Sequence, residues 1–271
     1  MKKVTVMIGV ALVCAMALPA AADTVKIAGA GGMIPLTTEL AKAYMKKNPG
    51  DTVEVEQKSL GTEGGLMKLT KGGSDISMAA HTLEAKEKAL PVVAYEIATV
   101  PGLFAVHNSV GVNALTSQQI CDIYGGKVTN WKEVGGKDAK IVVLTRPENE
   151  STKKAVRDGI ACFSSLKEGA NAIMVAKSTE MFTQLTSTAN AIGMINSVAL
   201  ADGAGKISAP KMDGKDVTKI SPAQWPINHR FHLVTGKQPS EAAKRFLRFV
   251  ASPDGSAVIK KEKAFPTPFK F

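Results

Sequence analysis

The chain has 271 residues, of which 45% are hydrophobic and 21% charged, and its formal net charge is +10 at pH 7. This length is enough for one large domain or two medium ones, each with a substantial apolar core. The basic surplus favours an anionic partner, and a solvated basic surface without a partner fits the same numbers. An aromatic content of 5% and the absence of a lysine and arginine block argue against nucleic acid.

The first 22 residues have the pattern of a secretory signal peptide. Lys2 and Lys3 precede an apolar run at 4–18, and three alanines at 20–22 supply small residues for cleavage. The apolar run is shorter than the roughly 20 residues of a membrane span. We therefore expect an exported protein, periplasmic or otherwise, cleaved near Ala22/Asp23. Removing two lysines and no acid lowers the formal charge from +10 to +8.

Two of the three cysteines follow the predicted cleavage point. Cys14 lies within the signal segment, whereas Cys121 and Cys162 remain and can pair in an oxidising compartment. A bridge would close a loop of about 40 residues and contribute roughly 4 kcal/mol. Two buried free thiols are the alternative. None of the four histidines has metal-ligand spacing relative to these cysteines, so we expect no metal site.

The order of segments along the chain predicts an α/β fold, because short apolar runs alternate with helical periodicity. No tandem repeat appears, which argues against a solenoid. Glycine-rich turns at 29–32 and 61–65 each precede a predicted helix. We expect strands at 24–28, 51–57, 75–80, 97–106, 141–145, 191–196 and 229–234, and helices at 34–47, 66–70, 116–124, 151–160 and 239–250.

Five stretches occur in a characteristic order: 29–35 (GAGGMIP), 61–65 (GTEGG), 115–131 (LTSQQICDIYGGKVTNW), 141–146 (IVVLTR) and 243–255 (AKRFLRFVASPDG). This order resembles that of the phosphate-binding proteins of ABC transporters, within the type II periplasmic binding protein superfamily. The stretch 115–131 carries the most specific likeness. The resemblance extends over essentially the whole chain after the signal segment.

The resemblance implies two α/β lobes, each a mixed sheet flanked by helices, joined by two hinge strands. The chain would pass from the first lobe to the second near 104–108 and return to the first lobe near 226–233. Lobe 1 would then combine 23–107 with 227–271, and lobe 2 would be 108–226. Both remaining cysteines would lie in lobe 2, where a disulfide is reasonable. The resemblance also implies a small anionic solute, a membrane ABC permease as partner, no cofactor and no catalysis, and we expect a monomer.

Anion capture needs backbone N–H groups at helix starts, hydroxyl donors and commonly an arginine, because a desolvated anion must recover its hydrogen bonds. The glycine turns and the loop before the predicted helix at 151–160 provide such groups. The resemblance implies ligand contacts in the first loop, which is the glycine turn at 29–32 with the residues just after it, in the second loop, which is the glycine turn at 61–65, and in the loop around Arg146. These positions are Gly32, Met33, Ile34, Thr62, Arg146, Glu150, Ser151 and Thr152.

Several of these positions depart from the family pattern. The family's aspartate that accepts a proton from hydrogen phosphate corresponds to Ala80, and a ligand serine corresponds to Glu150. A carboxylate about 4 Å from a dianion opposes binding by a few kcal/mol. Glu150 therefore turns outward, or accepts a donor on the ligand, or the ligand is not simple phosphate. Glu148 would clamp Arg146 or be an exposed loop acid, and His81 would donate into the cleft or be structural.

The first hypothesis for function is a receptor for phosphate or a phosphate-like oxyanion. The alternative is a repurposed family member with a degenerate cleft, which binds another solute or acts as an interaction or sensor protein. The sequence lacks a G-x-S-x-G elbow and an H-E-x-x-H pair, which argues against an enzyme. His229 and His232 would face opposite sides of a strand, so shared metal ligation is not expected.

Overall fold

The computed structural model describes residues 23–203 and 205–271. The predicted signal peptide, which includes Cys14, therefore lies outside the described residues. The predicted cleavage point before Asp23 lies at their edge. Within the described ranges, no helix combines the length and apolar character that a membrane span requires.

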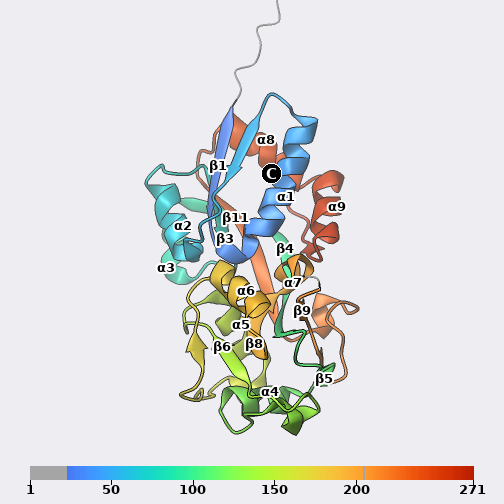
Figure 1. Ribbon diagram of the computed structural model, residues 1–271. Helices are drawn as coiled ribbons and strands as arrows, with labels where there is room; N and C mark the ends of the chain where they lie inside the picture. The colour runs from blue at the N-terminus through green and yellow to red at the C-terminus, as the bar shows by residue number, and fades with distance from the viewer. Residues whose placement is uncertain (1–22, 204) are drawn as a thin grey trace, which may run out of the picture.

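One mixed sheet extends through both ends of the molecule (Figure 1). The strands β1 and β3 are parallel, as are β6 and β8, whereas β11 and β4 run antiparallel to each other. Helices flank the sheet, so the predicted α/β class with a mixed sheet flanked by helices is confirmed. The strand order is β2 (Thr52–Val55), β1 (Thr24–Gly29), β3 (Ile76–Ala79), β11 (Asn228–Gly236), β4 (Val92–His107), β8 (Ala191–Asn196), β6 (Val142–Thr145) and β7 (Ile173–Met174), with β9 (Ile207–Ser208) and β12 (Phe265–Pro266) also on β4 and a separate pair of β5 (Ala114–Leu115) with β10 (Lys211–Met212).

The long strand β4 links the two ends of the sheet. Its first part, up to Pro101, pairs with β11, and the part from Gly102 onward pairs with β8. Pro101 has no N–H to donate, and the N–H of Gly102 bonds the carbonyl of Ile227 at 2.9 Å. A Cβ on Gly102 would lie 2.6 Å from Cγ2 of Ile227, so only glycine fits here. The partner of β4 therefore changes between Pro101 and Gly102, and the crossing between lobes near 104–108 stays a prediction.

The helices occupy both ends of the sheet and differ from the predicted set in two ways. The prediction for α1 was confirmed at both ends of the helix. However, α2 begins at Gly61 rather than at residue 66, and the helices α3, α6, α7 and α9 were not predicted. The bounds are α1 (Ile34–Lys47), α2 (Gly61–Thr70), α3 (Ala85–Lys88), α4 (Ser117–Tyr124), α5 (Ser151–Gly159), α6 (Ser178–Ser187), α7 (Ser197–Asp202), α8 (Glu241–Val250) and α9 (Pro253–Lys261), with 3-10 turns η1 (Gly31–Met33), η2 (Trp131–Val134), η3 (Ala161–Phe163) and η4 (Pro222–Gln224).

Two large apolar cores lie at the two ends of the sheet. The N-terminal core includes Tyr44 and Phe246, and the central core includes Trp131 and Phe163. Val198 of α7 packs into the N-terminal core although its number falls within 108–226. The lobe boundaries 23–107 with 227–271, and 108–226, stay a prediction.

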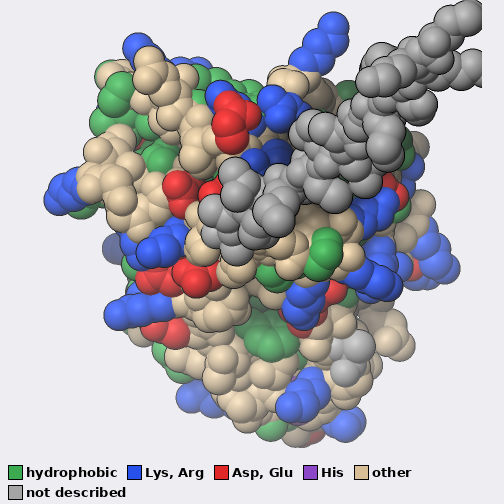
Figure 2. Space-filling view, turned by 90° about the horizontal axis from the view of Figure 1, so that it is seen from above, with side chains coloured by type: hydrophobic (Ala, Val, Ile, Leu, Met, Phe, Trp, Pro, Cys, Tyr) green, Lys and Arg blue, Asp and Glu red, His purple; other side chains and the backbone are tan. Residues whose placement is uncertain are grey.

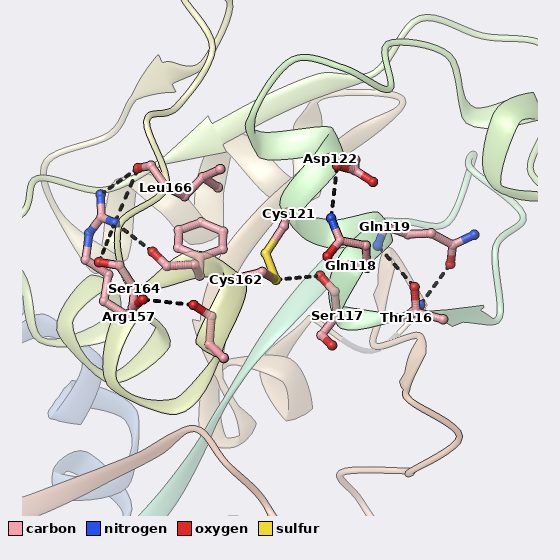
Figure 3. Close-up of a disulfide and its surroundings, with 12 residues drawn as sticks. Thr116, Ser117, Gln118, Gln119, Cys121, Asp122, Arg157, Cys162, Ser164 and Leu166 are labelled. Atoms are coloured by element: carbon pink, nitrogen blue, oxygen red, sulfur yellow. Dashed lines mark hydrogen bonds between the residues drawn. A yellow bond between two sulfur atoms is a disulfide. The ribbon is translucent and has the colours of Figure 1, made fainter.

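A disulfide joins Cys121 of α4 to Cys162 of η3 and closes a loop with a sequence separation of 41 (Figure 3). The bridged segment is also held from the α5 side. There the guanidinium of Arg157 donates to the carbonyl oxygens of Phe163 at 2.7 Å and Leu166 at 3.3 Å. The covalent bond and these hydrogen bonds together fix η3 against the central core.

Candidate functional site

A cavity of about 510 Å³ lies between the N-terminal core and the central core. One wall comes from η1, the start of α2 and the residues around α3, and the other comes from the starts of α5 and α6. The helix α6 contacts η1, the turn that leads directly into α1, near the middle of the molecule (Figure 1). Four helical segments therefore begin at one cavity.

Two of these four segments, α2 and α6, begin without a side-chain cap. Leu60 precedes α2 and Lys177 precedes α6, and neither residue makes a capping hydrogen bond. First-turn N–H groups have no acceptor within their own helix, and Ser, Thr, Asp or Asn commonly supply one. The uncapped starts carry partial positive charge at the cavity. The cavity is thus built to accept an anion.

Hydroxyl groups add to these backbone donors. Ser59 Oγ accepts from the N–H of Gly31 at 3.1 Å, and Thr62 Oγ1 accepts from the N–H of Ala80 at 3.2 Å. Each hydroxyl that accepts in this way keeps its own hydrogen for donation. Ala80 is buried behind Thr62 and does not line the cavity, so its role is to orient Thr62. The sequence reasoning missed Ser59.

Arg146 is the buried cation of the site, with 2% of its side chain exposed. Its Nη1 donates to the carbonyl of Val175 at 3.2 Å, and its Nη2 donates to Ser178 Oγ at 3.1 Å. Its Nε has no hydrogen-bond partner among the described residues. A buried guanidinium requires a counter-charge. Glu150 supplies it, with Oε1 at 2.8 Å from Nη2.

The carboxylate of Glu150 caps α5. It accepts from the N–H of Thr152 at 2.8 Å, from the N–H of Lys153 at 3.3 Å and from the hydroxyl of Ser151 at 3.2 Å. Burial raises the pKa of Glu150, but the bond and charge of Arg146 and the N–H of Thr152 outweigh burial and hold it below its usual value. An internal anion therefore occupies the start of α5, and Glu150 does not turn outward.

The first loop is only partly arranged as the sequence predicted. Gly32 lines the cavity, and its carbonyl accepts from Nδ2 of Asn196 at 3.1 Å. Ile34 lines an adjoining cavity of about 260 Å³. Met33 lies fully buried in the N-terminal core, and its N–H donates to the carbonyl of Ala30 at 3.0 Å. Met33 therefore has neither a side chain nor a free N–H at the cavity, which corrects the expectation for it.

Of the two alternatives stated for Glu148, the structure shows the exposed loop acid, and Glu150 pairs with Arg146 instead. Glu148 has 64% of its side chain exposed and accepts from Arg157 Nε at 2.6 Å. Arg157 lies farther along α5 and reaches back to Glu148, whereas the capping position places Glu150 beside Arg146. His81 lines the cavity, with Nε2 at 3.0 Å from Glu87 Oε2 and a buried Nδ1 that has no partner in the described ranges.

The two histidines of β11, His229 and His232, are both buried. Burial lowers the pKa of His229 to about 4, so this ring is neutral at pH 7. Across residues 23–203 and 205–271, no group of three His, Cys, Asp or Glu side chains is placed to hold a metal ion.

Two contacts join the walls of the cavity. Lys154 of α5 forms an ion pair with Glu84, next to α3, and Asn196 bonds the carbonyl of Gly32. Ser178 of α6 also approaches η1, since a Cβ on Gly31 would lie 3.6 Å from the Cβ of Ser178. The structure therefore has its two walls in contact, which is a closed arrangement.

Residues 16–254 match the family model of a PBP superfamily domain. The phosphate-binding protein PstS of Bacillus subtilis (strain 168) is 29% identical over 253 residues, which are 90% of this chain and 81% of that protein. PstS of Borreliella burgdorferi is 23% identical over 257 residues, covering 89% of this chain and 90% of that protein. Among solved structures, a chain assigned as a phosphate ABC transporter substrate-binding protein with bound phosphate, from Clostridium perfringens, has a TM-score of 0.77 and 29% identity, covering 90% of this chain and 99% of that one.

Proposed function

Because this chain belongs to the PBP superfamily, we propose that it is a solute-binding protein that captures phosphate or a phosphate-like oxyanion for an ABC importer. The observation that carries the proposal is the convergence of two uncapped helix starts, those of α2 and α6, and the buried Arg146 on one cavity. The names of the Bacillus subtilis and Clostridium perfringens relatives support phosphate as the first ligand to test.

The proposal includes capture by closure of two lobes and no reaction. Binding an anion requires only the backbone and side-chain donors among the groups that line the cavity, which also include the acids Glu63, Glu84, Glu87 and Glu150. Export to the periplasm, release to a membrane permease and a monomeric state without a cofactor or nucleic acid belong to the same proposal. The contacts of Lys154 with Glu84 and of Asn196 with Gly32 support closure, because they join the two walls.

The surface charge supports attraction of an anion only in a general way. The formal charge is +10 for the full chain, which adds a long-range field for anionic solutes. On the face in Figure 2, Lys and Arg are interspersed with Asp and Glu over the part that is described. Because this face carries no separate patch of Lys and Arg over its described part, we assign the selection of the ligand to the local donors of the cavity.

The test is a titration of the purified chain, freed of bound ligand by unfolding and refolding, with phosphate, sulfate and molybdate. We expect at least one of these oxyanions to bind in calorimetry. At a concentration 100 times its Kd, it should stabilise the protein by about 2.7 kcal/mol. Chloride at the same ionic strength is the control. If no oxyanion releases heat or raises the melting temperature, the proposal is wrong.

A second candidate function follows from Glu150, since an internal carboxylate already satisfies Arg146. The cleft would then be degenerate, and the chain would act as an interaction or sensor protein. Its partner would be held by a salt-sensitive contact. The same titration separates the two functions, because this candidate requires that the wild-type cavity bind none of the oxyanions. It also requires that the protein still capture one partner protein in a salt-sensitive way.

A further inference from the structure

Both oxygens of the Glu150 carboxylate are fully used by donors of the protein itself. Oε1 lies 2.8 Å from Arg146 Nη2 and accepts from the hydroxyls of Ser151 at 3.2 Å and Thr152 at 3.4 Å. Oε2 accepts from the N–H groups of Thr152 at 2.8 Å and Lys153 at 3.3 Å. A carboxylate offers about four lone-pair sites. No acceptor position is therefore left on Glu150 for a ligand to use.

The donors around Glu150 are of the three kinds that a bound oxyanion requires, namely first-turn N–H groups, hydroxyls and a guanidinium. The guanidinium of Arg146 is 2% exposed and borders the cavity, and its Nε has no partner among the described residues. Arg146 thus has capacity for a further acceptor. Glu150 therefore lies where an anion at α5 would bind, and it has the contacts that such an anion would make.

The tether of this internal anion makes it an effective competitor. Glu150 is the N-cap residue of α5, so its carboxylate is attached directly beside the donors that it uses. A group on a short flexible tether acts at an effective concentration on the order of millimolar. A free oxyanion at micromolar concentration has to overcome that advantage. The affinity of the site for a ligand is therefore reduced by the strength with which Glu150 holds it.

An oxyanion that replaces Glu150 compensates for both consequences of moving it. Turning the carboxylate away by itself would leave Arg146 buried without a counter-charge and α5 without a cap. A phosphate in the same place supplies the charge and the acceptors together. The Glu150 side chain is 15% exposed and borders a cavity of about 510 Å³. The open part of that cavity has room for the displaced side chain.

We propose that Glu150 is an internal competitor of the ligand: its carboxylate holds the anion position at α5 and Arg146, and an incoming oxyanion has to displace it. The displaced side chain turns into the open part of the cavity. This inference rests on the proposed function, because it assumes that the cavity binds an oxyanion. It adds the residue that limits the affinity and the exchange through which the ligand enters.

The variant Glu150→Ser should bind phosphate about tenfold more tightly than the wild type, or better. Serine is a favoured N-cap residue, so it can still cap α5, but it has no charge to hold Arg146. A tenfold gain is the lower end of what a hydrogen bond to a charged group contributes. Calorimetry at pH 7.5 and fixed ionic strength, on protein freed of bound ligand by unfolding and refolding, measures both dissociation constants. Loss of folding does not produce tighter binding.

Two further variants separate displacement from a general loss of negative charge. Glu150→Gln keeps the shape of the side chain and removes its charge, and its affinity for phosphate should rise at least threefold. The matched control is Glu148→Gln, which removes a charge from the same loop. Glu148 is 64% exposed, pairs with Arg157 and does not line the cavity. Because an exposed charge is screened, this control should stay within about twofold of the wild type.

A crystal structure of the wild type with phosphate makes the exchange visible. We expect a phosphate oxygen within hydrogen-bonding distance of the N–H of Thr152 and of the Arg146 guanidinium, with the Glu150 carboxylate no longer bonded to either. Phosphate bound in the cavity beside a Glu150 that still pairs with Arg146 would overturn the inference and leave the proposed function standing.

The affinities have equally distinct outcomes. If the wild type binds phosphate and Glu150→Ser binds it no more tightly, Glu150 is not a competitor, and the proposed function stands. An equal gain in Glu148→Gln also overturns the inference. Binding by Glu150→Ser and not by the wild type supports the competitor and contradicts phosphate as the wild-type ligand. If neither the wild type nor any variant binds an oxyanion, the proposed function is wrong, and the inference falls with it.

Discussion

Replacing Arg146 by methionine should weaken phosphate binding by about 1,000-fold, which corresponds to about 4 kcal/mol. Methionine fills a similar volume but removes the guanidinium, and a hydrogen bond to a charged group contributes about 1.5–3 kcal/mol. The substitution also leaves the carboxylate of Glu150 without its counter-charge, facing the incoming anion. Both effects act in the same direction. Calorimetry with phosphate at fixed ionic strength measures the change.

The control for this prediction is Arg230→Met, which removes the same charge from a side chain that is 57% exposed and pairs with Glu96. Its affinity for phosphate should stay within about twofold of wild type, since exposed ion pairs contribute little. The double variant Arg146→Met/Glu150→Gln removes the uncompensated carboxylate and should recover part of the loss. An affinity of Arg146→Met within about threefold of wild type would show that Arg146 does not hold the anion.

Removing the disulfide should lower the free energy of unfolding of the central core by about 4 kcal/mol on the chain-entropy model. The variant is Cys121→Ser/Cys162→Ser, and the bridge it removes closes a loop with a sequence separation of 41. The chain has two tryptophans, Trp131 and Trp225, and both lie in the central core. Their fluorescence during urea denaturation therefore reports on the region that contains the bridge.

Reduction of the wild type with a phosphine should reproduce the effect of the double serine variant, and the reductant should leave that variant unchanged. Phosphate binding should persist in the folded variant, because neither cysteine lines the cavity. A change in unfolding free energy below about 1 kcal/mol would mean that the bridge does not constrain the unfolded chain as the model requires.

Local periodicity was enough to predict the elements whose packing follows from their own sequence. In α1, the recurrence of Leu36, Leu40 and Tyr44 marks the face that packs into the N-terminal core. The start of α2 could not be predicted in the same way, because glycine disfavours a helix interior. Residue 65 is glycine because α2 packs closely against β1, where a Cβ on this residue would lie 2.5 Å from Cα of Gly29.

The order of the loops along the chain was enough to predict which residues lie at the cavity. It was not enough to predict which side chains pair with one another there. Arg146 and Thr62 were expected at the cavity, and the structure places both there. The acid that pairs with Arg146 is decided by the capping geometry of α5, which selects Glu150, whereas the sequence left open whether Glu148 clamps Arg146 or is an exposed loop acid. Ser178 was missed because α6 was missed, although Met181 and Leu185 repeat at helical spacing after it.

The most direct test of the oxyanion site is a crystal structure with arsenate, a heavier tetrahedral analogue of phosphate that can be located by its anomalous scattering. We expect one arsenic peak in the cavity, with the arsenate oxygens within hydrogen-bonding distance of the first-turn N–H groups of α2 and the guanidinium of Arg146. Diffraction from crystals grown at a saturating arsenate concentration, fixed by calorimetry, decides the matter. An arsenic peak at another place, with the cavity holding none, would contradict the account.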